Sequence, residues 1–399
     1  MACVLSIAGA LLATMADNEG LDRHLPDINS ETIETLLTIM SSSMLVIATL
    51  AVTSMLSAYA SASSIATPRS FSLIVADDVS QNALSTFVGA FIFSIVALIA
   101  VANGYYGKGG RFAVFTLTLL VLAIVIVMFV RWVDRIARLG RLGESVAKVE
   151  KATARALDHR RCAPTLGGIP ADSDPHRGQA IFCSTVGYVQ RVDVAALQAY
   201  CEQAAARIQL AALPGAFIAP GRPLAYVFSD TNEPPRDKAD AMVPAFVIGD
   251  DRLFDEDPRF GLIVLSEIAS RALSPGINDP GTAIQVISTL VRLFALWAKP
   301  LGEDDKREPD CDRVEVPEIS LNDMFDDAFS PIARDGAATV EVAMRLQKAF
   351  ASLASIGDSA MDKTARDHAR TALARAEHAL VLPEDLARVR AAAEFAGND

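Results

Sequence analysis

The sequence contains few of the residues from which metal sites and disulfide frameworks are built. Among its 399 residues are 5 cysteines and 5 histidines. The cysteines are odd in number and form no C-x-x-C pair, and the histidines are scattered along the chain. Zinc sites and disulfide frameworks need cysteines at short or paired spacings, so the sequence indicates neither of them. We therefore expect no bound metal and no cofactor.

Motifs typical of several enzyme classes are also missing. The chain has no G-x-S-x-G, Walker or H-E-x-x-H motif, and no dinucleotide fingerprint follows a strand-like segment. These motifs carry the nucleophiles, phosphate-binding loops and zinc ligands of large enzyme families. Their joint absence predicts that the protein is not an enzyme.

Positive charge is in short supply, because the formal net charge is -12. Nucleic-acid binding needs a concentrated basic surface, and only residues 131–161 are basic, with nine Lys and Arg against four Asp and Glu. The sequence therefore argues against a nucleic-acid partner. Apolar positions three and four residues apart in the same segment predict a basic juxtamembrane helix, or stalk.

Charge is absent altogether from two long stretches, residues 35–68 and 79–107. A helix needs about 20 apolar residues to cross a bilayer. A third run, 112–130, is apolar on every face, as lipid-facing or bundle-core helices are. We predict a polytopic α-helical membrane domain over 1–130, with spans at 36–58, 83–103 and 112–130. The apolar run 1–16 is either a short further span, which we favour, or a peripheral helix that lies against the bundle.

The orientation follows from the flanking charges, because Lys and Arg are retained on the cytoplasmic side of a membrane. The basic segment 131–161 follows the last span, whereas residues 17–34 carry six acids and one Arg. We predict a multi-pass membrane protein, with the lipid bilayer as partner and the carboxy-terminal domain in the cytoplasm.

The rest of the chain divides into two parts after a linker rich in Pro, Gly and Asp at 162–178. Residues 179–250 alternate in polarity and carry β-branched residues, which predicts a small β-rich module. Residues 251–399 keep apolar stripes at helical spacing and predict a cytosolic helical bundle, interrupted by a charged linker at 299–318. The predicted fold class is therefore mainly α.

The β-rich module resembles the barrel-sandwich arrangement of lipoyl and biotin carrier domains. Those domains pair a G-x-V turn, here Gly187-Tyr188-Val189, with a later G-x-x-V-x-x-G-x-x-L turn, here Gly215, Ile218, Gly221 and Leu224. No Lys occupies a hairpin tip where a prosthetic group would attach. The resemblance therefore implies a structural or binding use of the fold, not a carrier.

The stretch SPGINDP, residues 274–280, interrupts two helical runs with polar residues. One interpretation is a capping turn, in which Asp279 or Asn278 caps the helix that begins at Pro280. The other is a site for a ligand or a subunit contact. Four side-chain oxygens lie beside a helix amino terminus, which attracts anions; they belong to Ser274, Asn278, Asp279 and Thr282.

A second polar cluster, DDRLFDEDPRF, covers residues 250–260. Paired carboxylates can perform acid–base chemistry or bind divalent cations, and we single out Arg252 and Asp257 as candidate ligand-binding residues. The alternative is a solvated turn with internal ion pairs. A functional role gains weight if the fold brings this cluster beside residues 274–282.

The membrane part contains one hydroxyl-bearing helix face. Ser42, Thr49, Thr53 and Ser57 follow one another at seven-, four- and four-residue steps, which places them on one side of a helix. Such a face can line a wet path, or it can pack closely against another helix. Arg69, which follows Pro68, is either a cytoplasmic helix end or a pore-mouth residue that attracts anions.

Three stretches carry a resemblance to a known family: ATPRS (66–70), GYVQRVDVAALQAY (187–200) and DRLFDEDPRFGLIVLSEIASRALSPGINDPGTA (251–283). Together they are similar to the bacterial predicted-membrane-protein family catalogued as domain of unknown function 2254, and the similarity covers nearly the whole chain. Gly281 and the short first apolar run depart from the family's pattern. The resemblance implies a protein of the bacterial inner (plasma) membrane with membrane spans followed by a cytosolic domain, and it supplies no activity.

Two functions of different classes agree with these observations. The first is an oligomeric channel or transport protein whose cytosolic domain acts as a vestibule or gate. The second is a membrane-anchored binding or scaffold protein without a conduction path. Four spans without a charged interruption exceed what anchoring needs, which favours the first. Cyclic homo-oligomers are the common assembly, and an ion or a small ligand is the expected further partner.

Overall fold

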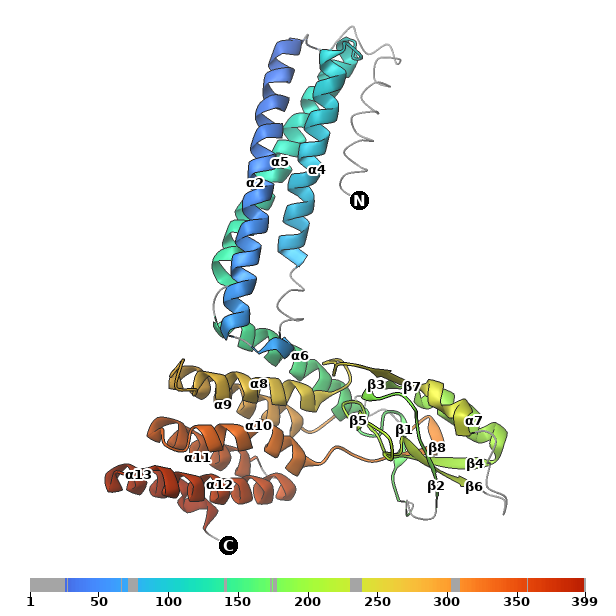
Figure 1. Ribbon diagram of the computed structural model, residues 1–399, viewed down its shortest axis with the longest axis vertical. Coiled ribbons are helices and arrows are strands. Elements are labelled where there is room, and N and C mark those ends of the chain that lie inside the picture. Colours follow the sequence, from blue (N-terminus) through green and yellow to red (C-terminus); the bar gives the residue numbers. More distant parts are fainter. Residues whose placement is uncertain are drawn as a thin grey trace. The chain divides into compact units, whose positions relative to one another are not determined.

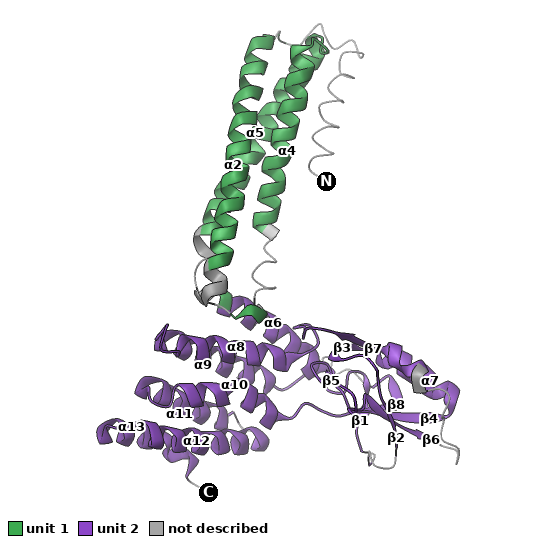
Figure 2. Cartoon of the chain, in the orientation of Figure 1, with its two compact units in different colours: residues 1–145 green, residues 146–399 purple. Residues whose placement is uncertain are grey.

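The computed structural model describes residues 26, 28–65, 67–70, 78–139, 142–172, 174, 178–229, 239–302, 309–356 and 358–397. The chain is mainly α-helical, with small sheets in its carboxy-terminal part (Figure 1). It divides into two compact units, unit 1 over residues 1–145 and unit 2 over residues 146–399 (Figure 2). The short span predicted at 1–16 lies outside the described residues.

The described part of unit 1 contains three long helices that pack against one another, α2 (Ser30–Ile65), α4 (Asp78–Ala102) and α5 (Lys108–Leu139). A short helix, η3 (Pro68–Ser70), follows α2. The predicted spans 36–58 and 112–130 lie within α2 and α5, and the span 83–103 ends one residue after α4. All three helices are long and apolar enough to cross a membrane.

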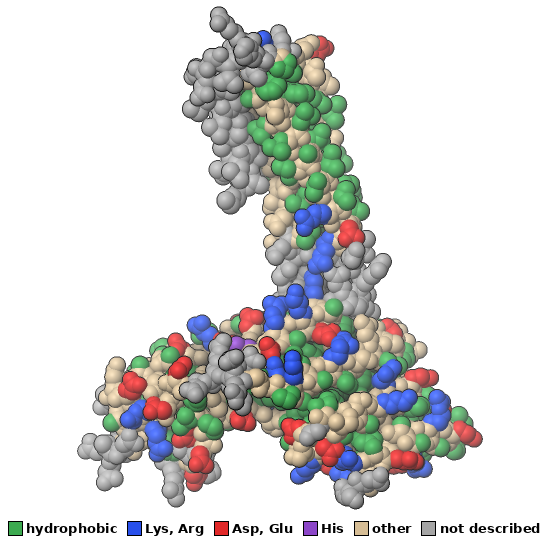
Figure 3. Space-filling view, turned by 180° about the vertical axis from the view of Figure 1, so that it is seen from behind, with side chains coloured by type: hydrophobic (Ala, Val, Ile, Leu, Met, Phe, Trp, Pro, Cys, Tyr) green, Lys and Arg blue, Asp and Glu red, His purple; other side chains and the backbone are tan. Residues whose placement is uncertain are grey.

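The core of unit 1 is apolar. It contains an aromatic cluster of Phe87 from α4 with Phe129 and Trp132 from α5, and the Phe87 and Trp132 ring centroids are 6.2 Å apart. The buried hydroxyls of Ser94 and Thr118 donate to carbonyls of their own helices, so they leave no unsatisfied group there. The outer surface is largely hydrophobic (Figure 3), as a lipid-facing surface requires.

Helix α6 (Leu142–Cys162) contains most of the segment predicted as a basic stalk, and from Val146 onward it belongs to unit 2. It packs closely on α8 (Pro258–Ala272), because a Cβ atom on Gly261 would lie 2.0 Å from the Thr153 hydroxyl. It also contacts α9 (Pro280–Trp297) through an ion pair of 2.7 Å between Glu150 and Arg292. This part of α6 is therefore a packed element of unit 2, whereas residues 131–139 of the predicted juxtamembrane helix lie in α5.

The described part of unit 2 contains two small sheets. Their strands are β1 (Gly168–Pro170), β2 (Gln179–Ile181), β3 (Gly187–Val192), β4 (Ala206–Leu210), β5 (Phe217–Ile218), β6 (Ala225–Ser229), β7 (Phe246–Gly249) and β8 (Cys311–Val316). The larger sheet has the order β1-β8-β4-β6-β2, with β8 parallel to both of its neighbours and the other pairs antiparallel. The smaller sheet, β5-β3-β7, is antiparallel. Helix α7 (Val194–Ala204) packs on β4 and β8.

Strand β8 corrects two expectations. The segment 299–318 was expected to be a linker, but it contains β8, and the β-rich module therefore draws β1 and β8 from outside the predicted bounds 179–250. Val314 and Val316 of β8 are fully buried in the core of the sheet. The bundle predicted over 251–399 is thus helical except for one strand that completes the neighbouring sheet.

Within the described residues of unit 2, six further helices pack together as a bundle: α8, α9, α10 (Leu321–Asp335), α11 (Val340–Ala354), α12 (Ser359–Ala379) and α13 (Pro383–Ala393). Short 3-10 helices are η5 (Ala239–Ala245), before β7, and η7 (Glu394–Ala396), after α13. The centre of the bundle is aromatic, since Phe294 of α9 contacts Phe325 and Phe329 of α10, with ring centroids 4.5 Å and 5.4 Å away. Phe350 of α11 joins the same cluster.

Helix α9 is the fourth helix that is long and apolar enough to cross a membrane. It differs from the helices of unit 1 in its surroundings. One face is buried against α8 and α11, and the other carries Arg292, which is bound to Glu150 of α6. A helix with one apolar and one charged face is the pattern of a globular domain. We therefore expect α2, α4 and α5, and not α9, to be the membrane spans.

Candidate functional site

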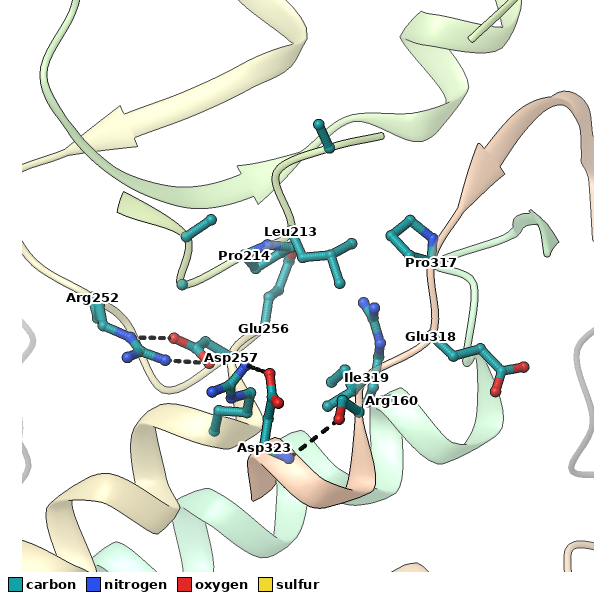
Figure 4. A pocket seen from close by; sticks show the side chains of 15 residues that line it. Arg160, Leu213, Pro214, Arg252, Glu256, Asp257, Pro317, Glu318, Ile319 and Asp323 are labelled. Atoms are coloured by element: carbon teal, nitrogen blue, oxygen red, sulfur yellow. Dashed lines mark hydrogen bonds and ion pairs between the residues drawn. The ribbon is translucent and has the colours of Figure 1, made fainter. Parts of the chain in front are cut away.

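A cavity of about 320 Å³ lies in unit 2 where the parallel strands β4 and β8 end (Figure 4). The loops after these strands, residues 211–216 and 317–320, form two of its walls. The segment before α8, the first turns of α8 and α10, and the end of α6 form the others. In open α/β sheets, ligands bind outside the carboxyl ends of parallel strands, and the position of this cavity beside β4 and β8 makes it a candidate site.

Arg252 and Asp257, singled out from the sequence, form an ion pair in the wall of this cavity. Arg252 donates two hydrogen bonds to the Asp257 carboxylate, from Nε at 2.7 Å and from Nη2 at 3.0 Å. Asp257 also caps α8, since it accepts from the Phe260 amide at 3.1 Å. Burial raises the pKa of Asp257, and its bonds to Arg252 act in the opposite direction. Both charges are thus compensated within the protein.

Gly215 allows the loop after β4 to approach this ion pair. Its φ is +92°, and a Cβ atom there would lie 2.2 Å from the Asp257 carboxylate and 2.9 Å from Arg252 Nη2. A side chain would collide with both partners and strain the backbone, so glycine is required here. The sequence had placed Gly215 in a turn of the β-rich module, and the contact with the ion pair is the physical reason for the residue.

A second arginine of the cavity, Arg259 in the first turn of α8, is bound by two carboxylates of α10. It donates to Asp327 at 2.6 Å and to Asp323 at 2.7 Å. Asp323 lines the cavity together with Arg259. The positive charge of Arg259 is therefore also compensated, and the two ion pairs fasten α8 to α10.

The third arginine, Arg160 near the end of α6, differs from the other two because two of its donors have no hydrogen-bond partner within the described residues. It is 2% exposed, and within the described residues neither its Nε nor its Nη2 has a hydrogen-bond partner. Its side chain points into the cavity, toward Leu213 and Pro317 (Figure 4). Burial lowers the pKa of Arg160 to about 10, although three neighbouring carboxylates act to raise it. The guanidinium group is therefore charged at neutral pH and presents donors to the cavity.

Glu256 and Glu318 add carboxylates to the cavity lining. Burial raises the pKa of Glu256, and the positive charges of Arg191 and Arg160 oppose this effect. Across the part of the chain that the structure describes, no group of three or more His, Cys, Asp or Glu side chains is placed to hold a metal ion. The cavity thus offers a guanidinium donor and carboxylate acceptors to a polar ligand.

A second cavity, of about 450 Å³, shares Glu256 with the first. The start of α7, residues that follow α6, and Asp310 and Cys311 contribute to its lining. Burial raises the pKa of the Cys311 thiol, so the thiol is protonated at neutral pH and is a poor nucleophile. The residues singled out from the sequence do not line this cavity.

The SPGINDP stretch forms a capping turn between α8 and α9. Asp279 caps α9 by accepting from the Thr282 amide at 3.1 Å and from its hydroxyl at 2.6 Å, and Pro280 opens the helix. Asn278 has a φ of 50°, and Ser274 donates to the Arg271 carbonyl at 2.7 Å. Asp279 and Thr282 thus satisfy each other, and Ser274 is bound to the backbone. A ligand or subunit contact at this turn remains a prediction.

The two polar clusters of the sequence do not meet. Arg252 and Asp257 precede the first turn of α8, whereas residues 274–282 follow its last turn. A helix of 15 residues separates them by about 22 Å. The fold therefore does not bring residues 250–260 beside residues 274–282, and only the first of these clusters lies at the cavity.

The hydroxyl face of α2 lies on the outside of unit 1. Ser42, Thr49, Thr53 and Ser57 are all exposed, whereas the opposite face, with Leu37 and Met44, is buried. Ser42, Thr49 and Thr53 donate to carbonyls of their own helix. The face is therefore not used for packing among α2, α4 and α5. Arg69 is exposed on η3.

Sequence reasoning missed Arg160, Glu318 and Asp323 as cavity residues. Arg160 belongs to a basic segment that reads as a juxtamembrane helix, and nothing local distinguishes it from its neighbour Arg161. Glu318 stood in an expected linker. The available signal was the acidic and basic cluster at 250–260, which did identify one wall of the cavity.

Comparison with known proteins identifies relatives of the chain. Residues 1–352 match the family described as predicted membrane protein (DUF2254). Uncharacterized proteins of Mycobacterium tuberculosis and of Mycobacterium bovis are each 31% identical to the chain over 141 residues. The aligned part is 35% of this chain and 26% of the relative, so the match spans about a quarter of the relatives' length. No solved structure matches the chain significantly.

Proposed function

The chain belongs to the family of predicted membrane proteins (DUF2254), and on that premise we propose that it is an oligomeric, channel- or transport-like protein of the bacterial inner membrane. Unit 1 is the membrane part, and unit 2 is a regulatory part in the cytoplasm. The basic segment 131–161, which covers the end of α5 and the residues after it, supports this orientation, because positive charge is retained on the cytoplasmic side.

The hydroxyl face of α2 is the observation that carries this proposal. The space enclosed by α2, α4 and α5 is filled by apolar side chains, so a path for ions through a single copy has no support. Ser42, Thr49 and Thr53 instead lie on the outer surface of the bundle. When several copies assemble around an axis, such a face can line a path between them.

A membrane-anchored binding protein without a conduction path is the second candidate. The cavity in unit 2 favours it, because ligand binding there needs no path through unit 1. In this case the exposed hydroxyls of α2 serve only as contacts between helices of neighbouring copies.

Ion flux into liposomes separates the two candidates. We expect the purified protein to conduct, and we expect Thr49→Val together with Thr53→Val to lower the flux by roughly tenfold, which corresponds to about 1.4 kcal/mol in the barrier. Valine keeps the shape of threonine and removes the hydroxyl.

Thr116→Val is the matched control, because Thr116 is an exposed threonine of α5 that donates to its own helix at 2.9 Å, as Thr49 does. Its flux should equal that of the unaltered protein. If no ion crosses the liposome membrane under any gradient, the channel proposal is wrong and the binding protein without a path is left.

A further inference from the structure

We propose that the cavity beside Arg160 binds a small organic acid that carries both a carboxylate and hydrogen-bond donors, as a free amino acid does. Such a site belongs to unit 2 alone and goes beyond the membrane function, because it holds whether or not unit 1 conducts. The lining residues that define it are Arg160, Leu213, Glu256, Pro317 and Glu318.

Arg160 has two buried hydrogen-bond donors, Nε and Nη2, that the protein leaves unsatisfied within the described residues. A buried polar group without a partner is destabilising, and the cost is greater for a charged group. Nε and Nη2 of Arg160 are buried without a partner among the described residues, and the side chain lines the cavity (Figure 4). A guanidinium fork matches the two oxygens of a carboxylate. An oxyanion in the cavity would therefore satisfy what the protein itself leaves open.

Arg160 is a better partner for an oxyanion than the other two arginines of the cavity, because those two already bind carboxylates of the protein. Arg252 already holds Asp257 through two hydrogen bonds, and Arg259 holds Asp323 and Asp327. A ligand that bound either of these would have to break an existing ion pair. Arg160 can accept an anion without such a loss.

Two glutamates in the cavity lining limit the charge that the rest of the ligand can carry. Glu256 and Glu318 line the same cavity, and both act on Arg160 through their negative charge. A ligand with several negative charges, such as a phosphate, would be repelled by these carboxylates at short range. A ligand with one carboxylate and an ammonium or hydroxyl group would instead donate to them.

The size of the cavity and its apolar walls limit the ligand to a small molecule. A volume of about 320 Å³ is at the lower end of the range for small-molecule sites. Leu213, Pro214, Pro317 and Ile319 provide apolar walls, so the few polar groups are left to orient the ligand. A compact amphoteric molecule suits this combination better than a nucleotide or a long chain.

Calorimetric titration of the full-length protein in detergent tests the site. The probes are the common free amino acids, each alone, with acetate and inorganic phosphate for comparison. We expect at least one amino acid to bind more tightly than acetate and phosphate. Arg160→Met should weaken that binding by roughly ten- to hundredfold, the range for a hydrogen bond to a charged group.

Thermal unfolding supplies a readout that a merely structural role of Arg160 would not give. Without ligand, the melting temperature of Arg160→Met serves as the baseline, because the change removes two buried donors without a partner and also the positive charge that acts on Glu256, Asp257 and Glu318. The amino acid that binds should raise the melting temperature of the unaltered protein and leave that of Arg160→Met unchanged.

Two further variants make the result decisive. Arg160→Lys keeps the charge without the planar fork and should also bind more weakly, while Arg388→Met, at an exposed arginine of α13, should bind normally. Failure of every amino acid to bind overturns the proposal, as does undiminished binding by Arg160→Met or Arg160→Lys. Phosphate that binds more tightly than every amino acid overturns it too. None of these outcomes depends on ion flux.

Discussion

At the scale of residues, three arginines line one cavity of unit 2 and differ in their partners. Arg252 and Arg259 are bound by carboxylates of the protein, while Nε and Nη2 of Arg160 have no partner within the described residues. Arg252 holds Asp257, which caps α8, and Arg259 joins α8 to α10. Exchanging Arg160 should therefore affect binding, whereas exchanging either of the others should affect stability.

The cap of α9 gives a prediction with a defined pH dependence. Asp279→Ala should destabilise the fold by about 1 kcal/mol at neutral pH, the usual effect of losing a cap. The hydrogen bond from the Thr282 hydroxyl is the main reason that the pKa of Asp279 is lowered. A carboxylate with a lowered pKa stabilises the fold above its unfolded pKa of about 4 and ceases to do so as the pH falls through its folded pKa.

The difference in melting temperature between Asp279→Ala and the unaltered protein should thus be full at pH 7 and shrink below about pH 4. Asp279→Asn is the control, because asparagine also caps helices and does not titrate in this range. A difference for Asp279→Ala that stays constant down to pH 3 would contradict the assignment.

Which residues could be found from the sequence depended on how local their partners are. Asp279 caps a helix that begins at the next residue, and Arg252 binds a carboxylate five residues away, so both were visible in short stretches. The surroundings of Arg160 come from the loops after β4 and β8 and from the segment before α8, and Glu318 among them is 158 residues away in the sequence. No local pattern records such a neighbourhood.

At the scale of elements, the contact between α6 and α8 depends on one glycine. A Cβ atom on Gly261 would lie 2.0 Å from the Thr153 hydroxyl and 2.7 Å from its Cβ. Gly261→Ala should therefore force the helices apart and destabilise unit 2 by about 1–3 kcal/mol, the cost of overpacking. Thermal unfolding of the full chain in detergent measures the effect.

Thr153→Ala in the same protein should restore part of the loss, because it removes the hydroxyl and the methyl group and leaves the Cβ atom. Gly276→Ala is the control, since a Cβ atom there meets nothing within 4 Å and the change should be within about 0.5 kcal/mol. Equal melting temperatures for Gly261→Ala and Gly276→Ala would mean that α6 does not pack on α8 in this way.

The helices were predictable from the sequence and strand β8 was not, for a physical reason. An apolar stripe repeats over several turns of each long helix, so the pattern accumulates. The six residues of β8, CDRVEV, include three charged ones, and Glu315 is nevertheless 3% exposed. Its charge is accommodated by Arg207 at 3.7 Å and by the Asp172 amide at 3.2 Å, which lie far away in the sequence. The strand therefore resembled a polar loop.

At the scale of the whole molecule, the crossing of the membrane by α5 gives a prediction about sidedness. Tyr105 lies between α4 and α5 and is 69% exposed, while Val381 lies between α12 and α13 and is 96% exposed. A single crossing by α5 puts these positions on opposite sides of the bilayer. Because the segment 131–161, at the end of α5 and beyond it, is basic, we expect Val381 to lie in the cytoplasm.

We therefore expect a membrane-impermeant maleimide to label Tyr105→Cys in intact spheroplasts and to label Val381→Cys only after the cells are opened. Both changes are made in a chain without its native cysteines. Labelling of Val381→Cys in intact spheroplasts would reverse the orientation. Labelling of neither position before opening would mean that α5 does not cross the membrane.

The parallel position of β8 between β1 and β4 has a consequence during synthesis on the ribosome. Residues 311–316 leave the ribosome long after the three apolar helices have been made. After β4 has been translated, about 100 further residues follow before β8, the common neighbour of β1 and β4, is complete. Until then the edge of β4 offers unpaired backbone groups to other nascent chains. Insertion of the apolar helices into the bilayer can thus precede completion of the sheet, and a chain interrupted before residue 311 would be anchored but aggregation-prone.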